Sequence, residues 1–456
     1  MKRSKGFMAM KMDMEKAYDR MEWSLILKIL QKLGFCEKWI SLMQECISSS
    51  SFLVLINGSP TNVFSPSRGL CQGDPLSPFL FILGSEVLLR LLHNAESNGK
   101  FLGFPLAPSC LRVSHLLFTD DLIIFSRATV EDATTIQSCI ELYQGCSGQL
   151  VNIKKSAVMF SKKVPRRMQR AIRRVSTLKG THFQEKYLGL PLSNEKSRSN
   201  TLEQVVDQVL KKVQCWKKNF LSQASSFCLV RVVGAATPIY PMSSWLFPKN
   251  SCSKIDGKLR DFWWGIKEGN KGLYLKAWDS ICVPKSARGF GLRRSTDMNK
   301  ALLSKLGWSV AINEDKPWVK YLSAKHLRGK SYWNVKARGE ALWVWKSIFS
   351  IRETQSKGAC WKISTGLGVN IWNAPWIPKS SNFKPIPRVQ GVQPLNWVFE
   401  LILSNPRRWD EEKLALCFEE ESARNIKDIQ LGEICQEDKM IWCPSSSGCM
   451  TAKSAY

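Results

Sequence analysis

The hydrophobic pattern at the start of the chain alternates with a period of two. From position 7 to 14 every even-numbered residue is a methionine, whereas Asp13 falls on the opposite side of the segment. This alternation predicts a strand that carries a carboxylate near its end. The residues that follow place apolar side chains at helical spacing up to Gly34, so we expect Asp13 at a strand-to-helix junction.

A second acidic segment lies about a hundred residues later. Positions 114–126 read SHLLFTDDLIIFS, in which two short apolar runs flank Asp120 and Asp121. The pattern predicts a hairpin with the acids at its tip. Adjacent acids in an apolar setting repel each other and lose hydration, and a divalent cation such as Mg²⁺ would offset both costs. The alternative is an ordinary turn, because aspartate is common in turns.

Between the two acidic segments a glycine-flanked loop precedes an apolar helical stripe. Gly69 and Gly73 permit close backbone approach, Asp74 can cap a helix, and Pro75 suits a first helical turn. A loop of this kind, leading into a helix, could contact the base or sugar edge of a nucleotide.

Five segments carry a resemblance to a known family. They read KMDMEKAYDRMEW, RGLCQGDPLSPFLF, LLFTDDLIIF, LVNIKKSAVMF and KYLGLPL. In order and approximate spacing they resemble the palm motifs of reverse transcriptases from non-LTR (LINE-type) retrotransposons, especially plant elements. The resemblance implies an α+β polymerase palm, an antiparallel sheet with helices on one face, followed by a mainly helical basic thumb and a Trp-rich C-terminal region. The implied activity is RNA-directed DNA synthesis by two-metal nucleotidyl transfer.

The resemblance also implies roles for single residues. Asp13 and Asp120 would be the primary ligands of two Mg²⁺ or Mn²⁺ ions, with Asp121 completing the site. Tyr18 matches the steric gate that lies under the incoming sugar and rejects a 2′-hydroxyl. The implied partners are an RNA template, a DNA primer and dNTPs.

Further positions of the nucleotide site follow from the same motifs. Gln72 and Gly73 match the loop that lines the nucleotide and the template strand. Lys154 or Lys155 falls where the family places a basic residue near the triphosphate. Thr119 departs from the family, which most often has alanine before the paired acids. We expect threonine to be tolerated because it is small enough for a hairpin tip and β-branched, as strands prefer.

The charge of the chain is concentrated in its middle. The formal net charge is +28, and between positions 161 and 350 Lys and Arg exceed Asp and Glu by 37 to 12. Such asymmetry favours a nucleic-acid track over a surface charged only for solubility. A helix is predicted near 162–175 with an apolar stripe and outward arginines, which also fits a nuclear-localisation cluster. The candidate nucleic-acid-binding residues are Arg166, Arg167, Arg170, Arg173 and Arg174.

The remaining chain suggests a domain plan. Most of the 18 tryptophans lie beyond position 215, and core packing is favoured over base stacking for most of them. Cys443 and Cys449, with no histidine after His326, give too few ligands for the zinc site that the end of the sequence resembles, so no zinc is expected.

The predicted regions are a palm at 1–160, a basic thumb-like or connection region at 161–250, a Trp-rich helical region at 251–373, a linker at 374–394, and the start of a zinc-binding-type region at 395–456.

The sequence leaves the activity of the chain open. Relative to the family, we expect truncation at both ends, without fingers, an endonuclease or the zinc ligands. The alternative to a polymerase module is therefore a silent retroelement remnant that at most binds nucleic acid. Fifteen cysteines without a C-x-x-C pair, no signal peptide and no membrane-length apolar stretch predict a nuclear or cytoplasmic protein that is neither secreted nor membrane-bound.

Overall fold

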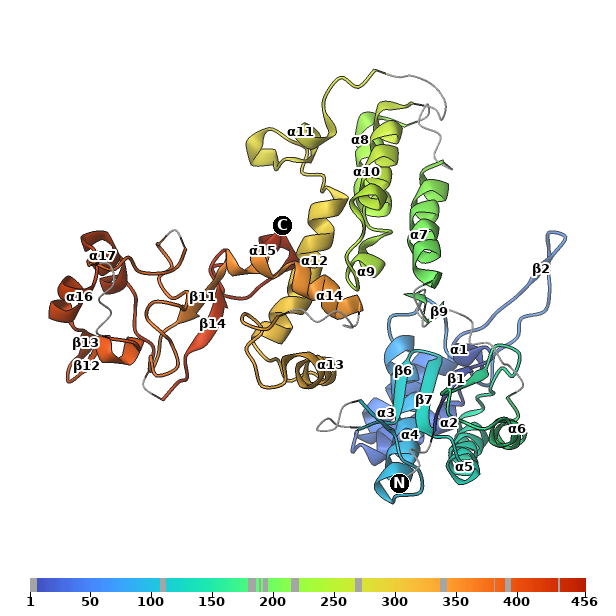
Figure 1. Ribbon diagram of the computed structural model, residues 1–456. Coiled ribbons are helices and arrows are strands. Elements are labelled where there is room, and N and C mark those ends of the chain that lie inside the picture. The colour runs from blue at the N-terminus through green and yellow to red at the C-terminus, as the bar shows by residue number, and fades with distance from the viewer. Residues whose placement is uncertain are drawn as a thin grey trace. The chain divides into compact units, whose positions relative to one another are not determined.

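The computed structural model divides the chain into two compact units, Met1–Asn194 and Glu195–Tyr456 (Figure 1). The division lies well beyond the boundary predicted at residue 160. The structure describes residues 6–106, 112–178, 186–187, 190–191, 196–214, 221–266, 273–336, 343–380, 382–389, 395–433 and 435–456.

An antiparallel sheet of four strands forms the framework of the first unit. The strand order is β6-β7-β1-β8, so the two segments that carry the acids, β1 and β7, are central neighbours. The strands are β1 Phe7–Asp13, β6 His115–Phe118, β7 Asp121–Arg127 and β8 Ala157–Phe160. The strand predicted at 7–14 and the hairpin predicted around the paired acids are both confirmed.

Helices pack against the methionine face of this sheet. Met10 and Met12 of β1 lie opposite Ile124 and Leu122 of β7, and all four are buried in one core with residues of the surrounding helices. The predicted α+β class is therefore confirmed for this unit. The helices are α1 Ala17–Arg20, α2 Trp23–Lys32, α3 Glu37–Ser48, α4 Ser77–Ser97, α5 Val130–Ser147 and α6 Arg166–Val175, and the short strands are β2 Leu55–Ile56, β3 Ser59–Pro60, β4 Phe104–Pro105, β5 Arg112–Val113, β9 Lys186–Tyr187 and β10 Leu190–Pro191.

The helix expected after Asp13 is interrupted. The chain becomes extended at Met21, which is fully buried, so a short α1 precedes the longer α2. Gly34 adopts a φ of 83° just beyond α2, a left-handed conformation that favours glycine and ends the helix. The break makes α1, which carries Tyr18, a separate element.

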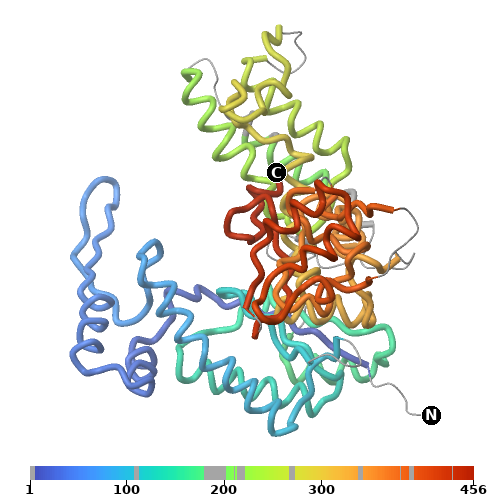
Figure 2. Tube along the Cα trace, turned by 90° about the vertical axis from the view of Figure 1, so that its left-hand side faces the viewer, coloured from blue at the N-terminus to red at the C-terminus, as the bar shows by residue number. Residues whose placement is uncertain are grey.

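The first part of the second unit is helical, as expected. Helices α7 and α10 pack against each other and run side by side in Figure 2. The helices are α7 Lys196–Gln214, α8 Gln223–Leu229, η2 Val230–Gly234, α9 Ile239–Met242, α10 Lys249–Trp264, α11 Trp278–Cys282, η3 Lys285–Ala287, α12 Ser295–Ala311, α13 Pro317–Leu322, η4 Ser323–Leu327, α14 Trp343–Ser350 and α15 Arg352–Ser356. In the described part of the chain, no helix is long and apolar enough to cross a membrane.

The end of the second unit mixes short strands and helices. Strands β11 and β14 pair with each other, as do β12 and β13. The elements are β11 Ala359–Lys362, η5 Val398–Leu401, β12 Ile402–Ser404, β13 Arg407–Trp409, α16 Glu411–Cys417, α17 Glu420–Lys427, β14 Lys439–Trp442 and α18 Ala452–Ala455.

The segment predicted as a linker at 374–394 needs correction where the structure describes it. Trp376 and Ile377 are fully buried and pack in one core with Val398 and Leu401. Proline and serine indicate irregular backbone, but irregular backbone between apolar residues can still pack. Burial also favours the structural interpretation of many tryptophans; the buried ones are Trp263, Trp308, Trp345, Trp376, Trp409 and Trp442.

Candidate nucleotide site

The three aspartates meet at one end of the central strands. Asp13 ends β1 and lies directly opposite Asp121, the first residue of β7. Asp120 and Thr119 form the turn that joins β6 to β7. Antiparallel pairing thus brings together acids that are more than a hundred positions apart in the sequence.

Two lysines offset the negative charge of this group. Lys11 Nζ lies 3.4 Å from Asp121 Oδ1, and Lys155 Nζ lies 3.7 Å from Asp13 Oδ2. Burial raises the pKa of the Asp13 carboxyl, Lys155 lowers it, and the neighbouring Asp120 and Asp121 raise it again. The raised pKa marks a site where negative charge is unfavourable and where a cation would be stabilising.

The donors present suit a hard divalent cation. Among the described residues, no three His, Cys, Asp or Glu side chains form a ready-made metal site. Mg²⁺ usually takes only one or two carboxylates and completes its octahedron with water and substrate phosphate oxygens, so a closed protein cage is not required. Asp13, Asp120 and Asp121 therefore fit such ions in their ligand chemistry.

Lys155 reaches Asp13 through a turn that Asn152 organises. The Asn152 side chain accepts hydrogen bonds from the backbone N–H groups of Lys154 and Lys155, at 3.2 and 3.3 Å. The Asn152 N–H donates to the Asp13 carbonyl at 2.8 Å, and the Asp13 N–H donates to Ser156 Oγ at 3.1 Å. This loop is therefore fixed to the end of β1, with Lys155 directed at the acids.

Tyr18 lies on the short helix α1 that follows β1. Its ring stacks on Phe81 of α4 with centroids 4.8 Å apart and an interplanar angle of 7°. The N–H of Leu70 donates to the Tyr18 carbonyl at 2.9 Å, which holds the glycine-flanked loop against α1. The stacking thus orients the Tyr18 ring, and the backbone hydrogen bond fixes the loop to the same residue.

Gly69 has no room for a side chain. Its φ is 94°, and a Cβ added there would lie 2.7 Å from the carbonyl oxygen of Asp19. The Trp23 indole donates to the Gly69 carbonyl at 2.6 Å. This close approach lets the loop continue to Gln72 beside Tyr18.

One cleft of about 650 Å³ unites most of the predicted nucleotide-site residues. Asp121 is not among its lining residues, although it pairs with Asp13, and Lys154 also lies outside the lining. Of the two candidate lysines, Lys155 therefore lines the cleft and Lys154 does not. The cleft is lined by Asp13, Met14, Lys16, Ala17, Tyr18, Gln72, Gly73, Asp74, Pro75, Pro78, Asp120 and Lys155.

The predicted arginine helix is α6, and it packs on α5 within the first unit. Ile172 is fully buried, whereas four of the five arginines are exposed. The fifth, Arg173, places its guanidinium over the Phe160 ring, 5.5 Å from the centroid, so it is partly committed to packing. The exposed members are Arg166, Arg167, Arg170 and Arg174.

Thr119 adopts a conformation that the sequence did not reveal. Its φ is 53°, in the left-handed region that β-branched residues strongly avoid. The strand preference of β-branched residues therefore does not support threonine here, because Thr119 belongs to the turn at the hairpin tip and not to a strand. Backbone strain is thus located directly beside the acids.

Sequence reasoning missed Lys11, Asn152 and Ser156. The period-two pattern did hold a signal for Lys11, since it shares the Asp13 side of the strand. Asn152 and Ser156 act through hydrogen bonds to the backbone of Asp13, and no local sequence pattern indicates such bonds.

The sheet, its helical layer and the acid-lined cleft define an α+β domain with a candidate nucleotide site. Residues 1–192 match the reverse transcriptase family, described as RNA-dependent DNA polymerases. Residues 1–192 are therefore a domain similar to reverse transcriptases, and the relatives found for the chain include proteins of retrotransposable elements.

Relatives extend the similarity beyond this domain. A protein of Arabidopsis thaliana named for ribonuclease H is 25% identical over 59% of this chain and 44% of its own. An uncharacterized 149 kDa protein of transposon TX1 from Xenopus laevis is 27% identical over 62% of this chain and 22% of its own. A Pol polyprotein of the type-1 retrotransposable element R2 from Popillia japonica is 31% identical over 33% of this chain and 20% of its own. The chain therefore spans less than half the length of each.

Among solved structures, telomerase of Candida albicans in complex with a TWJ fragment of telomeric RNA aligns with a TM-score of 0.28 and 10% identity. The alignment covers 70% of this chain and 49% of that one.

Proposed function

We propose that the first unit is a polymerase palm that extends a DNA primer along an RNA template by two-metal nucleotidyl transfer. The observation that carries the proposal is the convergence of Asp13, Asp120, Tyr18 and Lys155 on one cleft. When bound, two Mg²⁺ ions stabilise negative charge on the attacking and leaving oxygens. Asp13, Asp120 and Asp121 are the residues proposed to hold them.

The other residues of the cleft act on the nucleotide itself. Tyr18 is held flat against Phe81, and we propose it as the residue that faces the sugar and rejects a 2′-hydroxyl. Lys155 is exposed and directed at the acids, so it can neutralise a triphosphate that binds there. Gln72 and Gly73 border the base, and Gly73 has a φ of 96° that favours glycine.

The test is primer extension by the full chain on an RNA template with Mg²⁺ and dNTPs. Asp120→Asn removes a charge from the turn, whereas Asp19→Asn removes an exposed charge from α1 outside the cleft lining and is the matched control. Loss of extension in Asp120→Asn alone is expected. Undiminished extension by Asp120→Asn refutes the ligand assignment.

A second candidate is nucleic-acid binding without turnover. It is favoured by Lys11 and Lys155, which already offset the negative charge of Asp121 and Asp13. In that case the chain does not extend a primer but binds labelled RNA with strong salt dependence, since the phosphate contacts displace counterions. Charge reversal at Arg166, Arg170 and Arg174 should then weaken binding and flatten its salt slope.

A further inference from the structure

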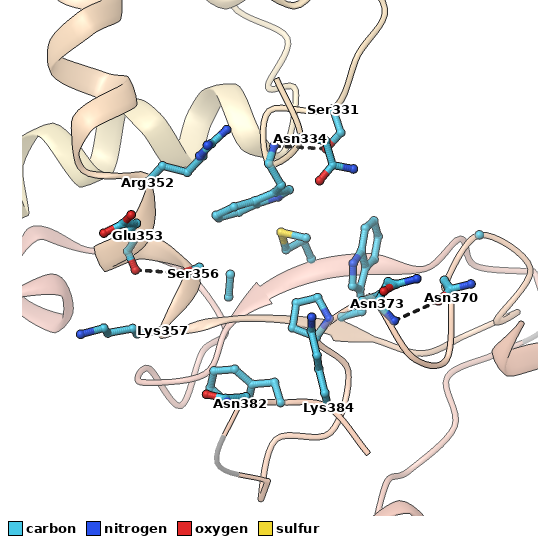
Figure 3. Close-up of a pocket in the computed structure, with 18 residues that line it drawn as sticks. Ser331, Asn334, Arg352, Glu353, Ser356, Lys357, Asn370, Asn373, Asn382 and Lys384 are labelled. Atoms are coloured by element: carbon cyan, nitrogen blue, oxygen red, sulfur yellow. Dashed lines mark hydrogen bonds between the residues drawn. The ribbon is translucent and has the colours of Figure 1, made fainter. Parts of the chain in front are cut away.

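The second unit contains a pocket of about 960 Å³ that is distant in sequence from the polymerase motifs. Its floor is the two-stranded ribbon β11–β14, on which Trp361 and Met440 are directly paired and share one face. Its walls come from the turn at 331–334, the end of α15 and the loops at 368–375 and 382–384. The lining therefore combines segments that only this fold brings together (Figure 3).

Aromatic side chains line this pocket from three separate segments. Trp361 is held by its strand, and its backbone N–H donates to the Pro375 carbonyl at 2.8 Å. Trp333 packs edge-on to Tyr332 with ring centroids 5.2 Å apart, and Phe383 comes from the loop after Trp376. Flat rings held in place by packing are suitable platforms for stacking a base.

Cationic side chains surround these rings. Arg352 Nη1 donates to the carbonyls of Tyr332 and Val335 at 3.2 and 2.7 Å, so its charge is held at the wall. Lys357 and Lys384 are exposed, and neither makes an ion pair with another described residue. Arg352 and Lys357 lie at one side of the view in Figure 3, and Lys384 lies below. Among the described residues of the lining, Glu353 is the single acid, so positive charge is in excess there.

Four asparagines complete the lining. The Asn370 Oδ1 accepts from the N–H groups of Trp372 and Asn373 at 3.1 and 2.9 Å, which fixes its orientation and leaves its NH₂ group to donate. Figure 3 shows Asn370 and Asn373 on the side opposite Lys357. An amide offers one donor and one acceptor side by side, as does the edge of a nucleobase. The lining asparagines are Asn334, Asn370, Asn373 and Asn382.

We propose that this pocket binds nucleotides of a single-stranded nucleic acid, apart from the polymerase site. Its volume is in the range of small-ligand sites, which suits one or two nucleotides. Bases stack on Trp361 and its neighbouring rings, asparagine amides bind base edges, and Lys357 and Lys384 receive phosphates. The proposal does not depend on catalysis, because none of these residues lines the cleft with the aspartates.

The test uses the full chain and single-stranded oligonucleotides of about eight nucleotides, a length within the usual site size of such proteins. RNA carrying 4-thiouridine and DNA carrying 4-thiothymidine are cross-linked in separate arms, and adducts are mapped by mass spectrometry. We expect adducts on the peptides that contain Trp333, Trp361 or Phe383, in one arm or in both. The arm that gives them identifies the sugar that the pocket accepts, and no adducts on these peptides in either arm refute the proposal.

Charge reversal provides a matched comparison. Lys357→Glu with Lys384→Glu should lower the salt slope of oligonucleotide binding by about 2 and remove the adducts. The control is Lys362→Glu with Lys439→Glu, an exposed cross-strand pair on the other face of the same ribbon, which changes the net charge equally. Equal effects of the two double variants on slope and adducts refute the proposal.

Two further measurements distinguish base stacking in this pocket from general anion binding. Trp361→Leu should weaken binding about 5- to 150-fold, whereas Trp361→Phe, which keeps a stacking ring, should bind more tightly than the leucine variant. Asp13→Asn should leave the adducts unchanged, so failure of the polymerase proposal would not affect this one. Removal of the adducts by polyglutamate as effectively as by unlabelled oligonucleotide would show a general anion site and overturn the assignment.

Discussion

Lys11 provides the sharpest test of how the acid cluster is stabilised. Its side chain is 9% exposed and its Nζ is 3.4 Å from Asp121, whose side chain is 24% exposed. At an effective dielectric constant of about 20, that separation corresponds to roughly 5 kcal/mol of Coulomb attraction before desolvation is subtracted. Removing one partner of a fully buried pair costs about 3–5 kcal/mol, and water that reaches Asp121 reduces this, so we expect Lys11→Met to cost about 2 kcal/mol at pH 7.

The cost of Lys11→Met should depend on pH. The pKa of Asp13 already lies above its ordinary value of 3.8, chiefly through burial, and Lys11 is among the groups that lower it. A group with a raised folded-state pKa contributes stability that is complete below the unfolded pKa and is lost as the pH rises through the folded one. Removing Lys11 raises the folded pKa further, so the deficit of the variant is largest near pH 7 and shrinks toward pH 4.

The assay is thermal unfolding together with hydrogen–deuterium exchange of the peptides that contain β1 and β7. A loss of about 2 kcal/mol corresponds to a fall of roughly 4–8 °C for a unit of this size. Lys28→Met, which removes an exposed charge from α2, is the control and should be nearly neutral. Added Mg²⁺ should stabilise Lys11→Met more than the parent, because the variant leaves more negative charge to neutralise. A deficit that is the same at pH 4 and pH 7 refutes this account.

Three further substitutions test the surroundings of the site. Thr119→Asn should stabilise the first unit by roughly 0.5–1 kcal/mol in urea unfolding, because asparagine tolerates a φ of 53°. The control Thr119→Val, which keeps a β-branched side chain, should not stabilise it. Tyr18→Ala should reduce the preference for dNTPs over ribonucleotides by roughly 10- to 200-fold in primer extension; an unchanged ratio argues against the gate. Asp132→Asn should cost about 3 kcal/mol in urea unfolding, since Asp132 is fully buried 2.7 Å from Arg127, and the exposed neighbour substitution Glu131→Gln should cost little.

Local patterns predicted the strand, the hairpin and the arginine helix well. Each of these elements shows a hydrophobic repeat within a short segment, such as the alternating methionines on the strand that contains Asp13. The pairing of Asp13 with Asp121 was not local, and the motif order only implied it through resemblance. The roles given to the site residues stay predictions until extension is measured.

The errors have physical causes of their own. The segment at 374–394 has the composition of a linker, yet Trp376 and Ile377 are buried because neighbouring elements provide a core for them. The β-branched side chain of Thr119 was counted in its favour because strands prefer such residues, whereas the register of β6 and β7 leaves Thr119 in the turn. Both depend on what a segment packs or pairs with, and a single sequence does not record that.

The two lysines at the acid cluster differ in how easily they can leave it. Lys155 has a side chain that is 59% exposed and lies 3.7 Å from Asp13, and exposed pairs of this kind contribute only about 0–1 kcal/mol. Lys11 is held within the sheet, where β7 and β8 flank its strand. A triphosphate can therefore draw Lys155 from Asp13 at little cost, whereas Lys11 stays with Asp121. The exposed Lys155 can therefore move to a bound triphosphate, whereas the buried Lys11 offsets the charge of Asp121 whether or not substrate is bound.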